Sequence, residues 1–286
     1  MMEKVLVTGS TGNIGYYVVE QLAKRGEQVK AGVFTVEKAK DIFSEPEVEI
    51  VPFDFQNPET FEHALQGVDR VFLVRPPQLA NPKEDMKPFL EKVKEKGIKQ
   101  VVFVSLMGVE KNPVVPHRKI EDMIKELQIP YTFLRPSFFM QNLNTTHKED
   151  IKLRNELFMP VGKAKTSFID TRDIAEVAAV CLSEEGHIGK AYTLTGNEAL
   201  DYYEIETILS EILGRKIEYK NPGVFEFRRT IIQRGIRKDF ANVMTMLYLV
   251  TKMKTAEKVT EDTEYLLKRK PISFKQYALD HKEHWI

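Results

Sequence analysis

The sequence predicts an α/β protein, in which a doubly wound parallel sheet is followed by a smaller, mostly helical C-terminal region. In the first half, short apolar runs alternate with amphipathic stretches of helical period. Several of these runs, such as 101–104, are apolar at every position, which is typical of strands buried on both faces. A glycine-rich turn at 9–15 joins the first predicted strand to the first predicted helix.

The first half carries six predicted strands and five predicted helices. The strands are expected at Lys4–Thr8, Gln28–Val33, Val48–Phe53, Arg70–Val74, Val101–Ser105 and Tyr131–Leu134. The helices are expected at Asn13–Arg25, Val36–Ile42, Pro58–Leu65, Pro82–Lys96 and His117–Leu127. Pro88 lies within the fourth helix and predicts a kink or a later start, because proline cannot donate the helical hydrogen bond.

The second half is less regular. It predicts helices at Ile169–Leu182 and Tyr202–Leu213, a strand at Lys190–Leu194, and a mostly helical stretch at Phe225–Lys254 that is broken at Gly235. No linker of distinct composition separates the halves. We expect one domain at residues 1–150 and a smaller region at 151–286, with 166–195 returning to the first domain.

Composition excludes several classes of protein. The 42 basic and 42 acidic residues balance, so no overall charge favours nucleic acid or an acidic membrane. A single cysteine, Cys181, allows no disulfide within the chain, which suits a reducing cytoplasm. A strand follows Met1 directly, no apolar run is long enough to span a bilayer, and the six histidines show no ligand spacing. We therefore expect a cytoplasmic monomer or homodimer without a metal, nucleic-acid or membrane partner.

The glycine-rich turn predicts a dinucleotide-binding site. Glycines allow the backbone to approach a pyrophosphate closely, and the N-terminus of the following helix presents free N–H groups to it. The G-x-x-G-x-x-G spacing follows a strand and opens a helix, which is the context such a site requires. The candidate binding residues are Gly9, Ser10, Thr11, Gly12, Asn13 and Ile14.

Five segments resemble the NmrA-like branch of the atypical short-chain dehydrogenases. They are Val5–Gly15, Ile129–Pro136 with the phenylalanines and Asn142 that follow, Phe168–Ala175, Tyr192–Gly196 and Pro271–Trp285. The resemblance implies a Rossmann-type NAD(P)-binding domain and a substrate-binding region. That branch contains NAD(P)H-dependent quinone reductases, reductases of plant-type phenolics, and redox sensors without catalytic activity.

The cofactor is expected to be NADP, with NAD as the alternative. The residue that selects between them should end the second strand, and there Phe34 supplies neither an acid for a ribose hydroxyl nor an arginine for a 2′-phosphate. Lys38 could meet that phosphate or simply be solvated. The resemblance implies that Asp54 and Phe55 line the adenine, although Asp54 could instead cap a turn. Arg75 could contact a phosphate or an anionic substrate, or lie on the surface.

The catalytic residues are expected at the end of the fifth strand and at the start of the helix that follows it. Ser105 stands where the resembling family has a serine, but the family's Tyr-x-x-x-Lys pair is absent, because Pro113 and His117 occupy its two positions. His117 could hydrogen-bond the nicotinamide ribose or a quinone oxygen, and an ordinary histidine pKa would allow proton donation near neutrality. The alternative is a solvated residue at a helix start.

The sequence favours reduction of a quinone or a similar electron-poor carbonyl, with a small apolar or aromatic substrate. The resemblance implies that Pro136, Ser137 and Phe138 pass the nicotinamide. A non-catalytic NADP(H)-binding sensor that regulates a protein partner is the alternative, motivated by the missing Tyr/Lys pair. A nucleotide-sugar epimerase is disfavoured, because that chemistry needs the missing phenol.

Overall fold

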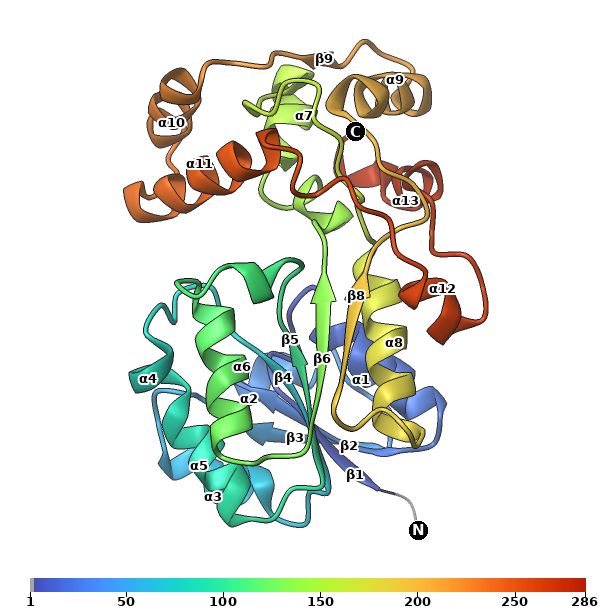
Figure 1. The fold of residues 1–286 in the computed structure, drawn as a ribbon. Coiled ribbons are helices and arrows are strands. Elements are labelled where there is room, and N and C mark those ends of the chain that lie inside the picture. Colours follow the sequence, from blue (N-terminus) through green and yellow to red (C-terminus); the bar gives the residue numbers. More distant parts are fainter. Residues whose placement is uncertain (1–2) are drawn as a thin grey trace. The chain divides into compact units, whose positions relative to one another are not determined.

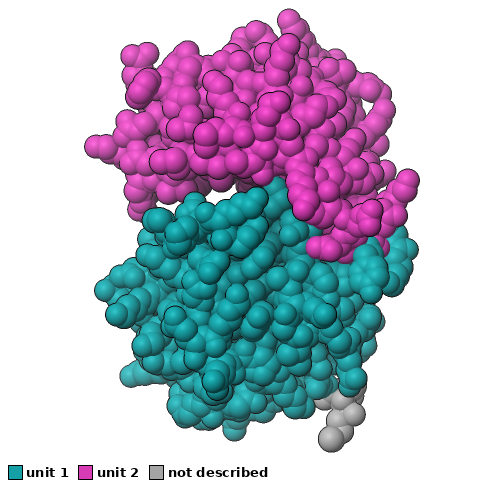
Figure 2. Space-filling model, in the orientation of Figure 1, with its two compact units in different colours: residues 1–136, 171–194, 265–269 teal, residues 137–170, 195–264, 270–286 magenta. Residues whose placement is uncertain are grey.

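The computed structural model describes residues 3–286, which form two compact units. Of these, unit 1 contains residues 3–136, 171–194 and 265–269, and unit 2 contains residues 137–170, 195–264 and 270–286 (Figure 2). The chain therefore passes more than once between the units. Within the described residues, every helix is too short or too polar to cross a membrane.

Unit 1 is built on a seven-stranded parallel sheet (Figure 1). Its strands are β1 (Lys4–Val7), β2 (Gln28–Val33), β3 (Val48–Pro52), β4 (Arg70–Val74), β5 (Gln100–Val104), β6 (Tyr131–Pro136) and β8 (Lys190–Leu194). They lie in the order β3-β2-β1-β4-β5-β6-β8, and all neighbouring pairs are parallel. This is the Rossmann-type order, so the predicted fold class and all seven expected strands are confirmed.

Helices cover both faces of the sheet (Figure 1). One face carries α1 (Gly15–Lys24) and α8 (Thr171–Ser183), and the other carries α3 (Glu59–Leu65), α5 (Lys87–Glu95) and α6 (Pro116–Glu126). The shorter elements are α2 (Val36–Ala39), α4 (Pro82–Asp85) and the 3₁₀ turn η1 (Val109–Lys111). The expected fourth helix is thus two helices, with Pro88 in the first turn of α5, where a missing N–H costs little.

An aromatic cluster stabilises the face of the sheet beneath α3 and α5. The ring of Phe53 packs against Phe55, Phe61 and Phe89 at centroid distances of 4.8, 5.9 and 5.0 Å. All four side chains are buried. Edge-on ring pairs add to the area that these side chains bury, so the strand ends on this side rest on a densely packed core.

Unit 2 is mostly helical. Its elements are η2 (Met140–Asn142), α7 (Lys148–Arg154), β7 (Glu156–Leu157), α9 (Tyr202–Leu213), β9 (Glu218–Tyr219), α10 (Val224–Gln233), α11 (Lys238–Lys252), α13 (Phe274–Asp280) and η3 (Lys282–His284). The helix α12 (Asp262–Leu267) runs in sequence from unit 2 into unit 1. The predicted break at Gly235 is confirmed, because it separates α10 from α11. The two-residue parallel pairing of β7 with β9 was not predicted.

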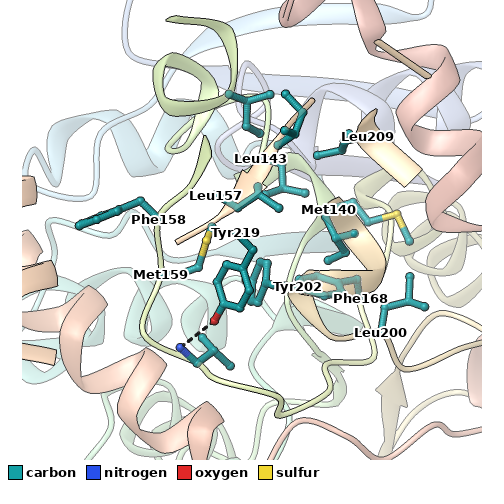
Figure 3. Close-up of a cluster of buried hydrophobic side chains, with 14 of the residues drawn as sticks. Met140, Leu143, Leu157, Phe158, Met159, Phe168, Leu200, Tyr202, Leu209 and Tyr219 are labelled. Atoms are coloured by element: carbon teal, nitrogen blue, oxygen red, sulfur yellow. Dashed lines mark hydrogen bonds between the residues drawn. The ribbon is translucent and has the colours of Figure 1, made fainter. Parts of the chain in front are cut away.

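The core of unit 2 is apolar with polar side chains at defined points (Figure 3). Leu157, Tyr202 and Tyr219 lie in this core, and the Tyr219 hydroxyl accepts a hydrogen bond of 3.2 Å from the backbone N–H of Val161. Trp285 is fully buried and its indole N–H donates to the carbonyl of Leu143 at 3.0 Å. The end of the chain is therefore a structural part of unit 2.

Candidate functional site

The glycine-rich turn joins β1 to α1 in a conformation that requires its glycines. Gly9 has a φ of +60°, and a Cβ there would lie 2.7 Å from Cγ1 of Val74. The N–H of Gly12 donates to the Gly9 carbonyl at 2.9 Å. A Cβ at Gly15 would lie 2.2 Å from that same carbonyl oxygen, so only glycine lets α1 begin directly against the turn.

The start of α1 has donors available for an anion. Its N-cap residue is Ile14, no side chain caps it, and its first turn holds no acidic residue. Thr11, Gly12 and Asn13 are exposed beside it. The first N–H groups of a helix lack partners within the helix, so this end fits the pyrophosphate of a dinucleotide.

Ser10 has a structural role within the turn. Its side chain is fully buried, and its hydroxyl donates to the Gly32 carbonyl of β2 at 2.9 Å. The hydroxyl therefore holds the turn against the second strand. Of the predicted binding residues in the turn, Ser10 can offer a ligand only its backbone.

The residues expected near the adenine differ in exposure. Phe34 follows β2 and is 82% exposed, and Lys38 on α2 is also exposed. The carboxylate of Asp54 accepts the backbone N–H of Gln56 at 2.9 Å, which is the turn-capping alternative. Phe55 is 7% exposed and belongs to the aromatic cluster, so its ring is mainly core. Phe34 is thus the aromatic ring available at this edge.

Ser105 and His117 lie on either side of the β5–α6 connection. Ser105 is buried, and its N–H donates to the Leu134 carbonyl at 2.7 Å. Its hydroxyl has no hydrogen-bond partner in the part of the chain that the structure describes. His117 is half-buried in the first turn of α6, and its ring stacks on Phe103 with centroids 6.1 Å apart. An unpartnered buried hydroxyl is costly, which marks Ser105 as a candidate ligand contact.

The charge state of His117 differs from the expectation. Burial, followed by the positive charge of Arg75, lowers the pKa of the imidazole to about 3. His117 is therefore neutral at physiological pH and cannot act as an imidazolium acid, which corrects the predicted proton donation near neutrality. As a neutral ring it still offers one N–H donor and one nitrogen acceptor.

An ion pair between a half-buried arginine and a fully buried carboxylate positions α6 and hence His117. The guanidinium of Arg135 on β6 makes two hydrogen bonds to the Glu121 carboxylate, at 3.0 Å from Nε and 2.7 Å from Nη2. Glu121 is fully buried on α6, one helical turn after His117. Sequence analysis did not assign Glu121 a role. The signal available in the sequence was an acidic residue on the side of a predicted helix that otherwise carries apolar residues.

Arg75 follows β4 directly and stiffens the loop after it. Its Nη1 donates to the carbonyls of Pro76, Pro77 and Leu79 at 3.0, 3.1 and 2.7 Å. The neighbouring strands β1 and β5 flank β4 in the sheet. Because the ends of adjacent parallel strands share one edge, the glycine turn, Arg75 and Ser105 lie along the carboxyl edge of unit 1, where ligands of open α/β sheets bind.

The end of β6 and the residues that follow it were expected to pass the nicotinamide. Pro136, the last residue of β6, is buried, and its carbonyl accepts the N–H of Met107 at 2.9 Å. In unit 2, the Ser137 hydroxyl lies 3.2 Å from that of Ser167, and the half-buried Phe138 packs edge-on against Phe168 at 6.5 Å. Phe138 is therefore part of an apolar, aromatic environment, as expected for this segment.

Unit 2 also contains a buried polar network that sequence analysis missed. Nε2 of His147 lies 2.6 Å from the Tyr248 hydroxyl, and Nδ1 lies 3.9 Å from the Asp150 carboxylate. Arg234 bonds to Asp150 at 2.7 Å and to Glu156 at 2.7 Å. Perturbed titratable groups gather at functional sites as well as in structural networks. His147 and Tyr248 are 101 residues apart in the sequence, so no local pattern indicates that they pair.

In the described part of the chain, no three His, Cys, Asp or Glu side chains come together as a metal site. Comparison with known proteins adds to this geometry. A model of the NmrA-like family matches residues 1–278. The chain belongs to the NmrA-like family.

Three similar proteins have named activities. This NmrA-like chain is 32% identical to an NAD(P)H azoreductase of Xenophilus azovorans over 282 residues, which cover 97% of each chain. It is 25% identical to quinone oxidoreductase 2 of Escherichia coli, over 84% of this chain and 85% of that protein. The structure of Citrobacter sp. triphenylmethane reductase complexed with NADP(H) matches with a TM-score of 0.87 and 25% identity, over 97% and 99% of the two chains.

Proposed function

We propose that this NmrA-like protein is an NAD(P)H-dependent reductase that delivers hydride to a quinone or a similar electron-poor carbonyl, with NADP(H) as the favoured cofactor. The observation that carries the proposal is the glycine turn, which fits a pyrophosphate against an uncapped α1. Relatives named as an azoreductase and a quinone oxidoreductase support the same reaction class.

The residues of unit 1 suit an acceptor that needs little acid catalysis. A bound NADPH would supply the hydride, that is, one proton together with two electrons. His117, held neutral, can donate a hydrogen bond to an acceptor oxygen, while the second proton of the reduced product comes from water. The buried Ser105 hydroxyl can serve as a further donor. The missing Tyr/Lys pair is therefore compatible with quinone reduction, although it disfavours alcohol oxidation.

The first test is turnover. The purified protein is titrated with NADPH and NADH, and a panel of simple quinones is then added while the absorbance of the reduced nicotinamide is followed. We expect saturable quinone-dependent oxidation. In His117→Ala we expect kcat to fall by about tenfold or more, because removing a transition-state donor costs that much, with NADPH affinity retained. His63→Ala, an exposed histidine on α3, serves as the matched control and should not change the rate. Tight cofactor binding without turnover on any acceptor would refute the reductase.

One observation favours the sensor as a second candidate. The helices α10 and α11 expose several large apolar side chains, including Phe225 at 89%, Val243 at 62% and Met246 at 62%. Such a surface is suited to a protein partner. The sensor predicts different affinities for NADP⁺ and NADPH and a partner retained by only one form. Equal affinities would contradict it.

The oligomeric state is a separate question. Light scattering would decide between the two expected states, a monomer and a homodimer.

A further inference from the structure

Arg75 is fixed in one orientation by its own loop. The three carbonyls of Pro76, Pro77 and Leu79 all accept from Nη1, and the N–H of Leu79 closes the turn onto the Pro76 carbonyl at 3.1 Å. Two prolines in the loop limit the backbone further. The guanidinium is therefore positioned before any ligand arrives, which reduces the entropy lost on binding.

The other edge of this guanidinium lacks a partner. Nε of Arg75 is buried and has no hydrogen-bond acceptor within the described residues. Among residues 3–286, no carboxylate forms an ion pair with Arg75, and Asp85 acts on it only at longer range. Burial lowers the pKa of the guanidinium, yet arginine stays charged at neutral pH. A half-buried cation with an unused donor loses hydration without compensation, and binding an anion restores the lost interaction.

The position of Arg75 indicates which kind of anion it would bind. Gly9 packs against Val74, so the end of β4 adjoins the glycine turn. The turn already supplies backbone donors for the phosphates of a dinucleotide. Arg75 also lies within the range at which its charge acts on the ring of His117. A guanidinium without a carboxylate partner among residues 3–286 is thus in the neighbourhood of the side chain that we expect to contact the acceptor.

We propose that Arg75 binds an acidic group of the electron acceptor, so that the preferred substrates are aromatic acceptors carrying a sulfonate or a carboxylate. Nε and Nη2 form the edge of a guanidinium that binds such groups with two parallel hydrogen bonds. This inference rests on the proposed function, because only that function makes the bound molecule an electron acceptor. The binding of an acidic aromatic compound at Arg75 can be measured without turnover.

The test uses two compounds that cannot be reduced. Naphthalene-2-sulfonate and the neutral naphthalene-2-sulfonamide are titrated calorimetrically into the full-length protein saturated with NADP⁺. We expect the sulfonate to bind about tenfold or more tightly than the sulfonamide, as two charge-assisted hydrogen bonds imply. In Arg75→Met this ratio should fall to about one. Arg75→Lys should retain part of it, because lysine keeps the charge but not the planar donor pair.

The controls separate this proposal from others. Arg25→Met removes a cation from the far end of α1, where Arg25 pairs with Glu184, and should leave the ratio unchanged. Thermal unfolding of each variant verifies the fold. An unchanged ratio in Arg75→Met, or binding of neither compound, overturns the proposal. Weaker NADP⁺ binding in Arg75→Met with an unchanged ratio also overturns it and assigns the anion to the cofactor phosphates. None of these outcomes depends on whether quinones are turned over.

Discussion

Replacing Gly15 by alanine should abolish tight cofactor binding while leaving most of the fold intact. The added Cβ would lie 2.2 Å from the Gly9 carbonyl oxygen, 2.7 Å from its carbon and 2.9 Å from Cα of Ser10. All three atoms are backbone, so no side chain can rotate away. The turn and the start of α1 must separate by about 1 Å before the contact becomes ordinary.

The displacement sets the magnitude. Hydrogen bonds from N–H groups to phosphate oxygens tolerate a range of about 0.5 Å, so a shift of about 1 Å breaks at least one of them. A hydrogen bond to a charged group contributes about 1.5–3 kcal/mol. Loss of one such bond weakens NADPH binding by about 10- to 100-fold. Overpacking at the same position should lower the free energy of unfolding by about 1–3 kcal/mol.

Two other glycines provide graded controls. A Cβ at Gly12 would lie 3.2 Å from the Gly9 carbonyl oxygen, so Gly12→Ala should have a smaller effect on binding. Gly26, at the end of α1, has no atom within 4 Å of an added Cβ but a φ of +77°, so Gly26→Ala should cost about 1 kcal/mol of stability without affecting affinity. Affinity is measured by calorimetry and stability by denaturant unfolding. Native-like NADPH affinity in folded Gly15→Ala would refute the assignment of the turn.

Three further predictions follow from the site. Phe34→Arg should shift the ratio of NADPH to NADH affinity toward NADPH by about tenfold, and Phe34→Asp should shift it the other way, since each supplies the missing charge; unchanged ratios would remove Phe34 from the cofactor site. Glu121→Gln should lower the free energy of unfolding by about 1.5–3 kcal/mol, because the fully buried carboxylate is replaced by an amide that can accept only one of the two Arg135 hydrogen bonds; a loss below about 1 kcal/mol would show that the pair contributes little. The pKa of His117 is about 3 when folded and about 6.5 when unfolded, so the unfolded chain binds the extra proton and stability falls as pH decreases from about 6.5 toward 3; thermal unfolding of His117→Gln should show a weaker pH dependence, and an identical profile would contradict the lowered pKa.

The strands of unit 1 could be predicted from sequence because their signal is local. Strands buried on both faces are apolar at nearly every position, and four of the five buried residues of β5 are apolar. The boundaries differ by one or two residues, as at β6, which continues to Pro136 because that residue still pairs with Leu194 of β8. The β7–β9 pair was missed because two-residue strands have no periodicity to detect.

Side-chain roles at the site were less predictable, because they depend on partners distant in sequence. The turn residues Ser10 and Asn13 look alike as small polar residues, yet Ser10 bonds to Gly32 and Asn13 is exposed. Phe34 and Phe55 each follow a strand, but Phe55 enters the aromatic cluster and Phe34 does not. A sequence specifies residue types near a site, while the tertiary packing decides which atoms remain available to a ligand.

The charge distribution along the carboxyl edge bears on the proposed reduction, for which we expect no Tyr/Lys pair. In the family's Tyr-x-x-x-Lys pattern, the cation is the lysine, which acts on the phenol of the tyrosine. The lysine position lies on the helix that begins with Pro116 in this chain. Here the residue at the lysine position, His117, is neutral, and the cation is Arg75 on the adjacent strand end. Burial is the larger cause of the low His117 pKa and Arg75 adds to it, because two like charges in one desolvated region are unfavourable. The edge therefore carries the positive charge of Arg75 near the neutral ring of His117, and in the proposed reaction this arrangement would stabilise an oxyanion without delivering a proton.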